Sequence, residues 1–383
     1  ADDLEQMGPT FIKLGQFFST RGDMLPATYV RALSRLQDRV GPIPYSEVEQ
    51  VVAEDLGVRI SKAFSYFEVE PIAAASLGQV HRACLRDGEI VAVKVQRPGI
   101  HERIRTDLEA LESIANMLDR HTETGKRSNF SSMLDEFRRT LHRELDYQQE
   151  ARNLETLDEN LRQFDLVIVP SPVPDYVTQR VLTMEFIRGR KVTSLGPLAR
   201  LEVDGAPLAE ELCRAYLHQI LVDGFYHADP HPGNVFLTDD GRIAFLDLGM
   251  VAQIGPSMQE SLLQLVLAIS EGRGEKAADL ILHMGKSVVE IDEDTVRRDI
   301  TQKVLSIQGL SMRDLALGRI LFDCTRVATD AGYRMPRDLT VLSKALLNVD
   351  EVARRLDPDF DPNDSIRRNA SSIMQHRLLK SFS

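Results

Sequence analysis

The sequence predicts an α+β chain with an N-terminal helical segment, a small strand-rich lobe and a larger, mainly helical lobe. Near the N-terminus, apolar residues recur at helical spacing, at Phe11, Leu14, Phe17 and Phe18. Two short apolar runs, residues 80–85 and 90–95, then flank an Asp-Gly pair, which is typical of a β-hairpin. After Gly189 the helical pattern returns and continues over most of the remaining chain.

The same patterns predict further elements and the domain boundaries. Helices are expected at residues 45–56, 104–118 and 130–157, the last as one long charged helix. Strands are expected at residues 166–169 and 181–186, around a proline-rich loop at 170–174, and at two sites near 235–246. The expected domains are a helical extension (1–66), the strand-rich lobe with a helical insertion (67–186), the helical lobe (187–350) and a tail (351–383).

The composition excludes several classes of protein. Of 383 residues, 43% are hydrophobic and 27% are charged, which is typical of a folded globular chain. The net charge of −12 argues against nonspecific nucleic-acid binding. Three cysteines far apart argue against a cysteine zinc site or a disulfide framework and favour a reducing compartment. We find no apolar run of the 18 or so residues that a membrane span requires.

The most specific motif is the segment His-Ala-Asp-Pro-His-Pro-Gly-Asn at residues 227–234, which is followed by Asp247-Leu248-Gly249. Upstream, Val91-Ala92-Val93-Lys94 lies on the second strand of the predicted hairpin. Protein kinases share such a set: a strand lysine, a loop aspartate with an asparagine five residues later, and Asp-Phe-Gly. Here Ala228 replaces the arginine of that loop and Leu248 replaces the phenylalanine.

These residue types suit phosphoryl transfer, in which crowded phosphate oxygens must be neutralised. Lys94 supplies a positive charge for the α- and β-phosphates, and Asn234 and Asp247 supply the hard oxygen ligands that Mg²⁺ prefers. Asp229 is suited to orient an attacking hydroxyl or water, or to accept its proton. The set therefore predicts ATP or ADP with Mg²⁺ in a cleft between the two lobes.

Two further segments are predicted to contact the nucleotide. The glycine-rich loop of kinases aligns with residues 73–80, where the first two glycines are replaced by alanines. Because a Cβ atom limits close approach to phosphates, we expect an altered mode of nucleotide binding. The predicted contacts of this loop are Ala73, Ala74, Ala75, Ser76, Gly78 and Val80. An interlobe hinge is predicted to meet adenine at Met184, Glu185, Phe186 and Ile187.

Purely structural roles would also suit several of these residues. Lys94 alone would suit an edge strand, where lysine discourages aggregation, and the alanines alone would suit ordinary loop filler. His227 and His231 are four residues apart, which invites a zinc site with Asp229. The two intervening prolines disfavour the helix that would align them, so we expect His227 to brace the loop by hydrogen bonds.

Taken in order, these motifs resemble the UbiB (ADCK) family of atypical protein-kinase-like proteins over residues 10–250. The matching pieces are Lys13-Leu14-Gly15-Gln16 (KxGQ), the alanine-rich loop, Val91–Lys94, Glu144-Leu145-Asp146-Tyr147 with Glu150-Ala151, the 227–234 loop and Asp247-Leu248-Gly249. The resemblance implies a two-lobed kinase-like fold that binds Mg-ATP or Mg-ADP and has weak ATPase activity, without evident protein kinase activity in trans. It also implies a role in isoprenoid lipid metabolism, notably ubiquinone biosynthesis, often at a membrane.

In that family the N-terminal extension covers the usual protein-substrate site. Lys13 and Gln16 share a helix face, and Gly15 between them indicates close packing because glycine costs about 1 kcal/mol inside a helix. The resemblance gives Glu144 and Asp146 as their partners, so these four residues form a predicted regulatory plug. The alternative is that the two carboxylates lie on a solvated helix face.

The partner of Lys94 is left open by its sequence surroundings. Glu109 and Glu112 are the nearest candidates along the chain, whereas the resemblance favours Glu150. Asp146 and Glu150 are four residues apart and are expected on one helix face. The predicted catalytic set is then Lys94, Glu150 and Asp229.

The tail from residue 365 carries basic residues without acidic ones, at Arg367, Arg368, Arg377 and Lys380. It is predicted either to pack on the helical lobe or to lie on an anionic membrane surface as an amphipathic helix.

Two functions follow from the sequence. The first is a Mg-dependent ATPase or small-molecule kinase with an isoprenoid or phenolic lipid as substrate, peripheral to a membrane. The second is a nucleotide-gated binding module for a lipid or quinone-biosynthesis complex. A conventional protein kinase ranks third, because no Ala-Pro-Glu ending of an activation segment follows Gly249.

Overall fold

The structure is a computed structural model that describes residues 2–19, 27–33, 36, 40–122, 130–196, 203–288, 291–306 and 317–381. The chain divides into two compact units. The first consists of residues 1–152 and 171–186, and the second of residues 153–170 and 187–383. The chain thus enters the second unit at residue 153, returns to the first unit for residues 171–186, and then completes the second unit.

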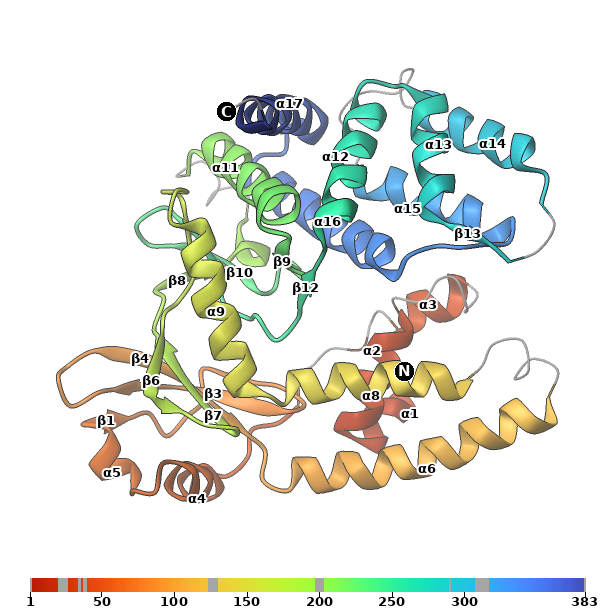
Figure 1. Ribbon diagram of the computed structural model, residues 1–383. Coiled ribbons are helices and arrows are strands. Elements are labelled where there is room, and N and C mark those ends of the chain that lie inside the picture. The colour runs from red at the N-terminus through yellow and green to blue at the C-terminus, as the bar shows by residue number, and fades with distance from the viewer. Residues whose placement is uncertain are drawn as a thin grey trace. The chain divides into compact units, whose positions relative to one another are not determined.

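An antiparallel sheet lies in the first unit, with the strand order β1-β3-β4-β7-β6 and with β2 paired to β3 (Figure 1). Its strands are β1 (Tyr66–Phe67), β2 (Ala73–Ala74), β3 (Gly78–Cys84), β4 (Ile90–Gln96), β6 (Pro172–Val177) and β7 (Val181–Glu185). The predicted hairpin is confirmed, because β3 and β4 pair along their whole length. Gly88 takes a φ of 100° in its turn, a conformation that suits glycine.

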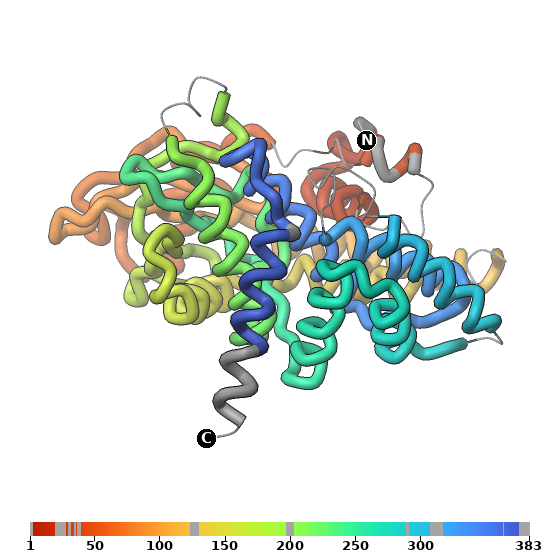
Figure 2. The backbone as a smooth tube through the Cα atoms, turned by 90° about the horizontal axis from the view of Figure 1, so that it is seen from above, coloured from red at the N-terminus to blue at the C-terminus, as the bar shows by residue number. Residues whose placement is uncertain are grey.

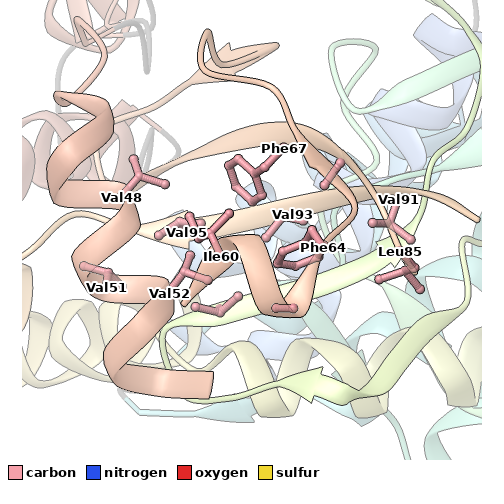
Figure 3. Close-up of a cluster of buried hydrophobic side chains, with 13 residues drawn as sticks. Val48, Val51, Val52, Ile60, Phe64, Phe67, Leu85, Val91, Val93 and Val95 are labelled. Carbon is pink, nitrogen blue, oxygen red and sulfur yellow. The ribbon is translucent and has the colours of Figure 1, made fainter. Parts of the chain in front are cut away.

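The helices α4 (Tyr45–Leu56) and α5 (Ile60–Ala63) cover one face of this sheet. Figure 3 shows the buried side chains that meet there, among them Val48, Val51 and Val52 of α4 and Val91, Val93 and Val95 of β4. Each buried valine contributes about 1.5 kcal/mol or more. Because side chains alternate along a strand, these valines turn Lys94 of β4 to the opposite face of the sheet.

A second core joins the N-terminal helices to the helical insertion of the first unit. The helices are α1 (Asp2–Met7), α2 (Pro9–Ser19), α3 (Ala27–Leu33), α6 (Ile100–His121) and α8 (Phe130–Glu144). The ring of Phe17 on α2 lies 5.5 Å from that of Phe137 on α8. A Cβ atom on Gly15 would collide with Leu36, so the close packing expected at this glycine is confirmed.

The predicted helix at 130–157 is wrong, because Leu145 and Asp146 separate α8 from α9 (Tyr147–Leu161). Two polar contacts explain the break. The Asp146 carboxylate accepts the backbone N–H of Gln149 at 2.9 Å and so caps a new helix. The buried amide of Gln96 donates to the Leu145 carbonyl at 2.7 Å, which leaves that carbonyl outside a helical ladder. Asp146 therefore precedes the helix that carries Glu150 and does not share a face of it.

Two other boundaries differ from prediction. The helix expected at 104–118 begins earlier and ends later, as α6, and follows Gly99 with a φ of 68°. The loop expected at 170–174 lies partly in β6, which pairs with β7 at the end of the sheet order. An edge strand tolerates proline because one of its sides makes no ladder hydrogen bonds.

The second unit contains a four-stranded sheet of order β5-β11-β10-β8 and two separate strand pairs, β9–β12 and β13–β14. Its strands are β5 (Val167–Ile168), β8 (Gly189–Lys191), β9 (Phe225–His227), β10 (Val235–Thr238), β11 (Ile243–Phe245), β12 (Val251–Gln253), β13 (Lys286–Ser287) and β14 (Tyr333–Arg334). The two strands expected near 235–246 are confirmed as β10 and β11.

Helices make up most of the rest of this unit. They are η1 (Val192–Ser194), α11 (Gly205–His218), η2 (Gln219–Asp223), α12 (Pro256–Ser270), α13 (Gly274–Met284), α14 (Glu293–Leu305), α15 (Leu317–Asp330), α16 (Arg337–Leu356) and α17 (Pro362–Ser381). The segment η2 is a π-helical turn that continues α11. In Figure 2, α17 runs beside α11 and α12. Of the helices described, none has the length and apolar character to cross a bilayer.

The helix break at Leu145-Asp146 gives a first prediction. Gln96→Leu removes the buried donor to the carbonyls of Leu145 and Gln179, so we expect the free energy of unfolding to fall by about 2–3 kcal/mol in urea titrations. Gln50→Leu is the matched control, because that amide lies on the exposed side of α4 and donates to Glu54 at 2.8 Å. Equal stability of the two variants would contradict the role given to Gln96.

Candidate functional site

Lys94 and Glu150 form a buried ion pair in the first unit. The Lys94 Nζ atom lies 2.6 Å from Glu150 Oε1 and 2.8 Å from Oε2, and the Glu150 side chain is only 2% exposed. The Lys94 ammonium also lies over the ring of Tyr147, 5.3 Å from its centroid. Of the nearer alternatives, Glu112 pairs with Arg138 instead. The lysine is thus held as a fixed positive charge.

The alanine-rich segment forms a tight hairpin turn in the first unit. Ala73 and Ala74 are β2 and pair with Val80 and Gln79 of β3. The Ala75 N–H donates to the Gly78 carbonyl at 2.8 Å. The Ala75 carbonyl accepts two bonds from the Arg97 guanidinium, at 3.0 and 2.9 Å. Arg97, which we did not predict, therefore fixes the conformation of this turn.

Ser76 and Gly78 of this turn are both buried. Ser76 is completely buried. A Cβ atom on Gly78 would come within 2.6 Å of the Val95 carbonyl, so this glycine is required by packing against β4. Of its alanines, Ala73 is exposed and Ala74 and Ala75 are half-buried.

The predicted hinge residues lie at the end of β7. Met184 is buried and pairs with Ala92, and Glu185 pairs with Val91. The N–H of Glu185 donates to Ser171 at 2.9 Å, and that of Phe186 donates to Ile90 at 3.2 Å. Both amides are therefore used within the sheet. Ile187 is the first residue of the returning second unit.

The 227–234 loop of the second unit is braced by backbone hydrogen bonds, within the loop and to Met250. Ala228 N–H donates to the Met250 carbonyl at 2.9 Å, and Asn234 N–H donates to His231 at 2.9 Å. His227 is buried, with its Nδ1 atom 3.3 Å from the Met250 carbonyl, and burial lowers the pKa of its imidazole. The expected bracing role of His227 agrees with these contacts. Among the described residues, no group of three or more His, Cys, Asp or Glu side chains is arranged to hold a metal.

Asn234 and Asp247 lie at the same end of the β10–β11 hairpin. Val235 pairs with Phe245, and the Leu246 N–H donates to the Asn234 carbonyl at 3.3 Å. The Asp247 carboxylate accepts the Gly249 N–H at 3.1 Å, which fixes its direction. Asn153 of α9 donates to the Leu248 carbonyl at 2.9 Å and holds the Asp-Leu-Gly turn. Strand register thus places Asn234 and Asp247 at one end of the hairpin.

Asp229 is held by two residues that we did not predict. Lys344 Nζ lies 3.1 Å from Asp229 Oδ1, and Asn348 Nδ2 donates to the same oxygen at 2.9 Å. Both donors lie on α16 and are one helical turn apart. Their signal in the sequence is a lysine and an asparagine at i, i+4 spacing within the helical pattern that follows Gly189.

The four residues of the predicted regulatory plug separate into different contacts. Lys13 Nζ lies 2.6 Å from Glu144 Oε2, and both side chains are less than 20% exposed. Gln16 instead donates to the Leu36 carbonyl at 3.4 Å, and Asp146 caps α9. A partly buried ion pair therefore fixes α2 on α8, while Gln16 and Asp146 make other contacts.

The described part of the tail packs on the second unit. Ser365, Ile366 and Ala370 of α17 are buried, and Arg368 pairs with Glu210 of α11 at 2.9 Å. The side chains of Arg377 and Lys380, on which the membrane-surface interpretation also rests, lie outside the described residues.

Known proteins share both the motifs and the fold. Residues 35–280 match the family described as the ABC1 atypical kinase-like domain, and residues 300–361 match the UbiB helical domain. A chloroplastic Arabidopsis thaliana protein, Activity of bc1 complex kinase 8, is 36% identical over 98% of this chain and 54% of its own length. A probable protein kinase UbiB of Marinobacter nauticus is 34% identical over 94% of this chain and 66% of its own length.

Among solved structures, Rv3197 of Mycobacterium tuberculosis in complex with erythromycin has a TM-score of 0.64 to this chain. The two chains are 23% identical over 94% of this chain and 90% of that one, a likeness that concerns the fold. The predicted kinase-like fold and the resemblance to UbiB proteins are confirmed. The chain spans about half to two thirds of the length of the two curated relatives above.

The Lys94–Glu150 pair gives a second prediction. Lys94→Met leaves the buried carboxylate without its cation, so we expect the free energy of unfolding to fall by about 3–5 kcal/mol in urea titrations. The double variant Lys94→Met/Glu150→Met should recover most of that loss, because no unpaired charge remains. As a matched control, Arg355→Met breaks an exposed pair with Glu351 and should cost less than about 1 kcal/mol. Additive losses in the double variant would refute the pairing.

Proposed function

Because the chain belongs to the ABC1 atypical kinase-like family, we propose that it binds a magnesium nucleotide and transfers the γ-phosphoryl group of ATP. The acceptor is water or the hydroxyl group of a small or lipid molecule. The observation that carries the proposal is the pairing of Lys94 with Glu150 at 2.6 Å. Kinases use such a lysine–glutamate pair to hold a positive charge for the nucleotide phosphates.

The second unit supplies the groups for the metal and the acceptor. Asn234 and Asp247 offer hard oxygens of the kind that Mg²⁺ prefers, and they lie at one end of a hairpin. Two such ligands do not make a cage, so phosphate oxygens and water would complete the coordination. When bound, Mg²⁺ would neutralise charge on the phosphates. Asp229 is the base that would take the acceptor proton.

A second function is favoured by one specific observation. The alanine turn uses its own Ala75 N–H and is packed by Gly78 against β4, unlike a glycine loop whose amides are open to phosphate. This supports the alternative of a catalytically weak module that binds nucleotide and changes the affinity for a lipid or a partner. Turnover distinguishes the two functions, whereas nucleotide binding alone does not.

We extend the proposal to the setting that the UbiB resemblance implies. The acceptor or regulated ligand would be an isoprenoid or phenolic lipid, in quinone metabolism such as ubiquinone biosynthesis. The chain would then work at an anionic membrane surface in a reducing compartment.

A third prediction tests the proposed reaction. Mg-ATP turnover is measured with and without anionic liposomes, for the wild type and Asp247→Asn. We expect turnover to fall about 100-fold in the variant, because a bound metal ion supplies several kcal/mol of charge stabilisation. Asp240→Asn is the matched control, since Asp240 lies in the exposed turn of the same hairpin and pairs with Arg242.

The outcomes separate the two functions. Turnover that depends on Asp247 and rises with liposomes supports a phosphotransferase or ATPase coupled to a membrane surface. Nucleotide binding without turnover in either condition would contradict the enzyme and favour the gated module.

A further inference from the structure

We propose that Lys344 and Asn348 of α16 are the positioning residues of Asp229. They hold one oxygen of its carboxylate and leave the other to accept the acceptor proton. This inference rests on the proposed function, because it assigns a role to Asp229 in that reaction. It goes further by giving the helical domain at residues 300–361 a part in the chemistry of the domain at residues 35–280.

The hydrogen bonds divide the Asp229 carboxylate into two different oxygens. Lys344 Nζ at 3.1 Å and Asn348 Nδ2 at 2.9 Å both reach Oδ1. In the described parts of the chain, the hydrogen bond from Asn348 ends on Oδ1, and the Lys344 ammonium pairs with the same oxygen. One oxygen is therefore anchored by two donors, while the other keeps its lone pairs for an incoming hydroxyl group. A general base needs this asymmetry, because it must be oriented and still able to accept a proton.

The charges around Asp229 keep the carboxylate ionised. Burial alone would raise its pKa, but the nearby ammonium of Lys344, followed by His231 and His227, outweighs burial and holds the pKa below its usual range. Among these three groups, only Lys344 also donates a hydrogen bond to Asp229. The asparagine adds a second donor without a charge. Lys344 and Asn348 together therefore control both the ionisation and the orientation of the Asp229 carboxylate.

The helix that carries these donors is tightly packed within the second unit. Ala345, Leu346 and Val349 of α16 are buried. Gly318 of α15 approaches α16 so closely that a Cβ atom would come within 2.7 Å of the Leu347 nitrogen. Lys344 and Asn348 are one turn apart, on the side of α16 that meets the 227–234 loop. A packed helix thus fixes both donors against the loop.

The step that this arrangement serves can be written in full. As the acceptor oxygen bonds to the γ-phosphorus, the bond from that phosphorus to the bridging oxygen of ADP breaks. The acceptor proton moves to Asp229 Oδ2, and ADP leaves with the bond electrons. Lys344 and Asn348 remain on Oδ1 throughout and touch neither the nucleotide nor the acceptor.

A fourth prediction tests the positioning role with two readouts. The first is the pH dependence of kcat for Mg-ATP turnover. The second is the titration of the Asp229 carboxyl carbon by NMR in ¹³C-aspartate-labelled protein, assigned by its absence in Asp229→Asn. Lys344→Gln should raise both the acid limb of the pH profile and the Asp229 titration midpoint by about one pH unit, because a neighbouring cation is lost. Lys344→Arg should keep both near the wild-type values.

The control variants distinguish an effect on the position of the Asp229 carboxylate from a general effect on folding. Arg355→Gln removes a cation from the same helix but one that pairs with Glu351, so both readouts should stay unchanged. Asn348→Ser, a second variant that keeps the charge of Lys344, should lower kcat with little shift of the titration midpoint. Unchanged pH limbs and midpoints in Lys344→Gln, with turnover still abolished by Asp229→Asn, would overturn this inference and leave the proposed function intact. Turnover that is indifferent to Asp229→Asn would overturn the proposed function itself.

Discussion

The interruption between α8 and α9 is the constraint on which the first unit depends. Because a new helix begins at Tyr147, Glu150 lies in a first turn, where the helix dipole and the unpaired N–H groups favour a carboxylate. Within one continuous helix Glu150 would lose that stabilisation while remaining almost fully buried. The break also ends α8 at Glu144, the residue that anchors α2 through Lys13. One interruption thus places Glu144 and Glu150 at the ends of two helices, where they pair with Lys13 and Lys94.

In the second unit, too, the functional side chains are fixed by the elements that surround them. Its candidate base is fixed by two donors from a packed helix, and its candidate metal ligands are fixed by hairpin register. The 227–234 loop is held by backbone hydrogen bonds and by the buried His227, whose pKa is lowered by burial. Phosphoryl transfer is helped mainly by charges and dipoles held in position before the reaction. Each unit therefore holds charged side chains in position through ion pairs, Lys94 with Glu150 in the first and Lys344 with Asp229 in the second.

Local signals allowed much of this structure to be predicted. The Asp-Gly turn, the apolar spacing of α4 and the motif around Asp229 all lie within short stretches of chain. The break at Leu145 could not be predicted, because its cause is Gln96, which is 49 residues away. Asn348 was missed for the same reason, since it is 119 residues from Asp229. Strands of two or three residues, such as β9 and β12, carry too little pattern to be recognised.

The central claim is that this chain binds its nucleotide as a magnesium complex, and calorimetric titration with ADP tests it most directly. Wild-type protein should bind ADP at least tenfold more tightly with Mg²⁺ than with a chelator, because Asn234 and Asp247 act only through the cation. In Asp247→Asn that difference should shrink, while the affinity measured in chelator stays the same. Equal affinity of the wild type with and without Mg²⁺ would contradict the account.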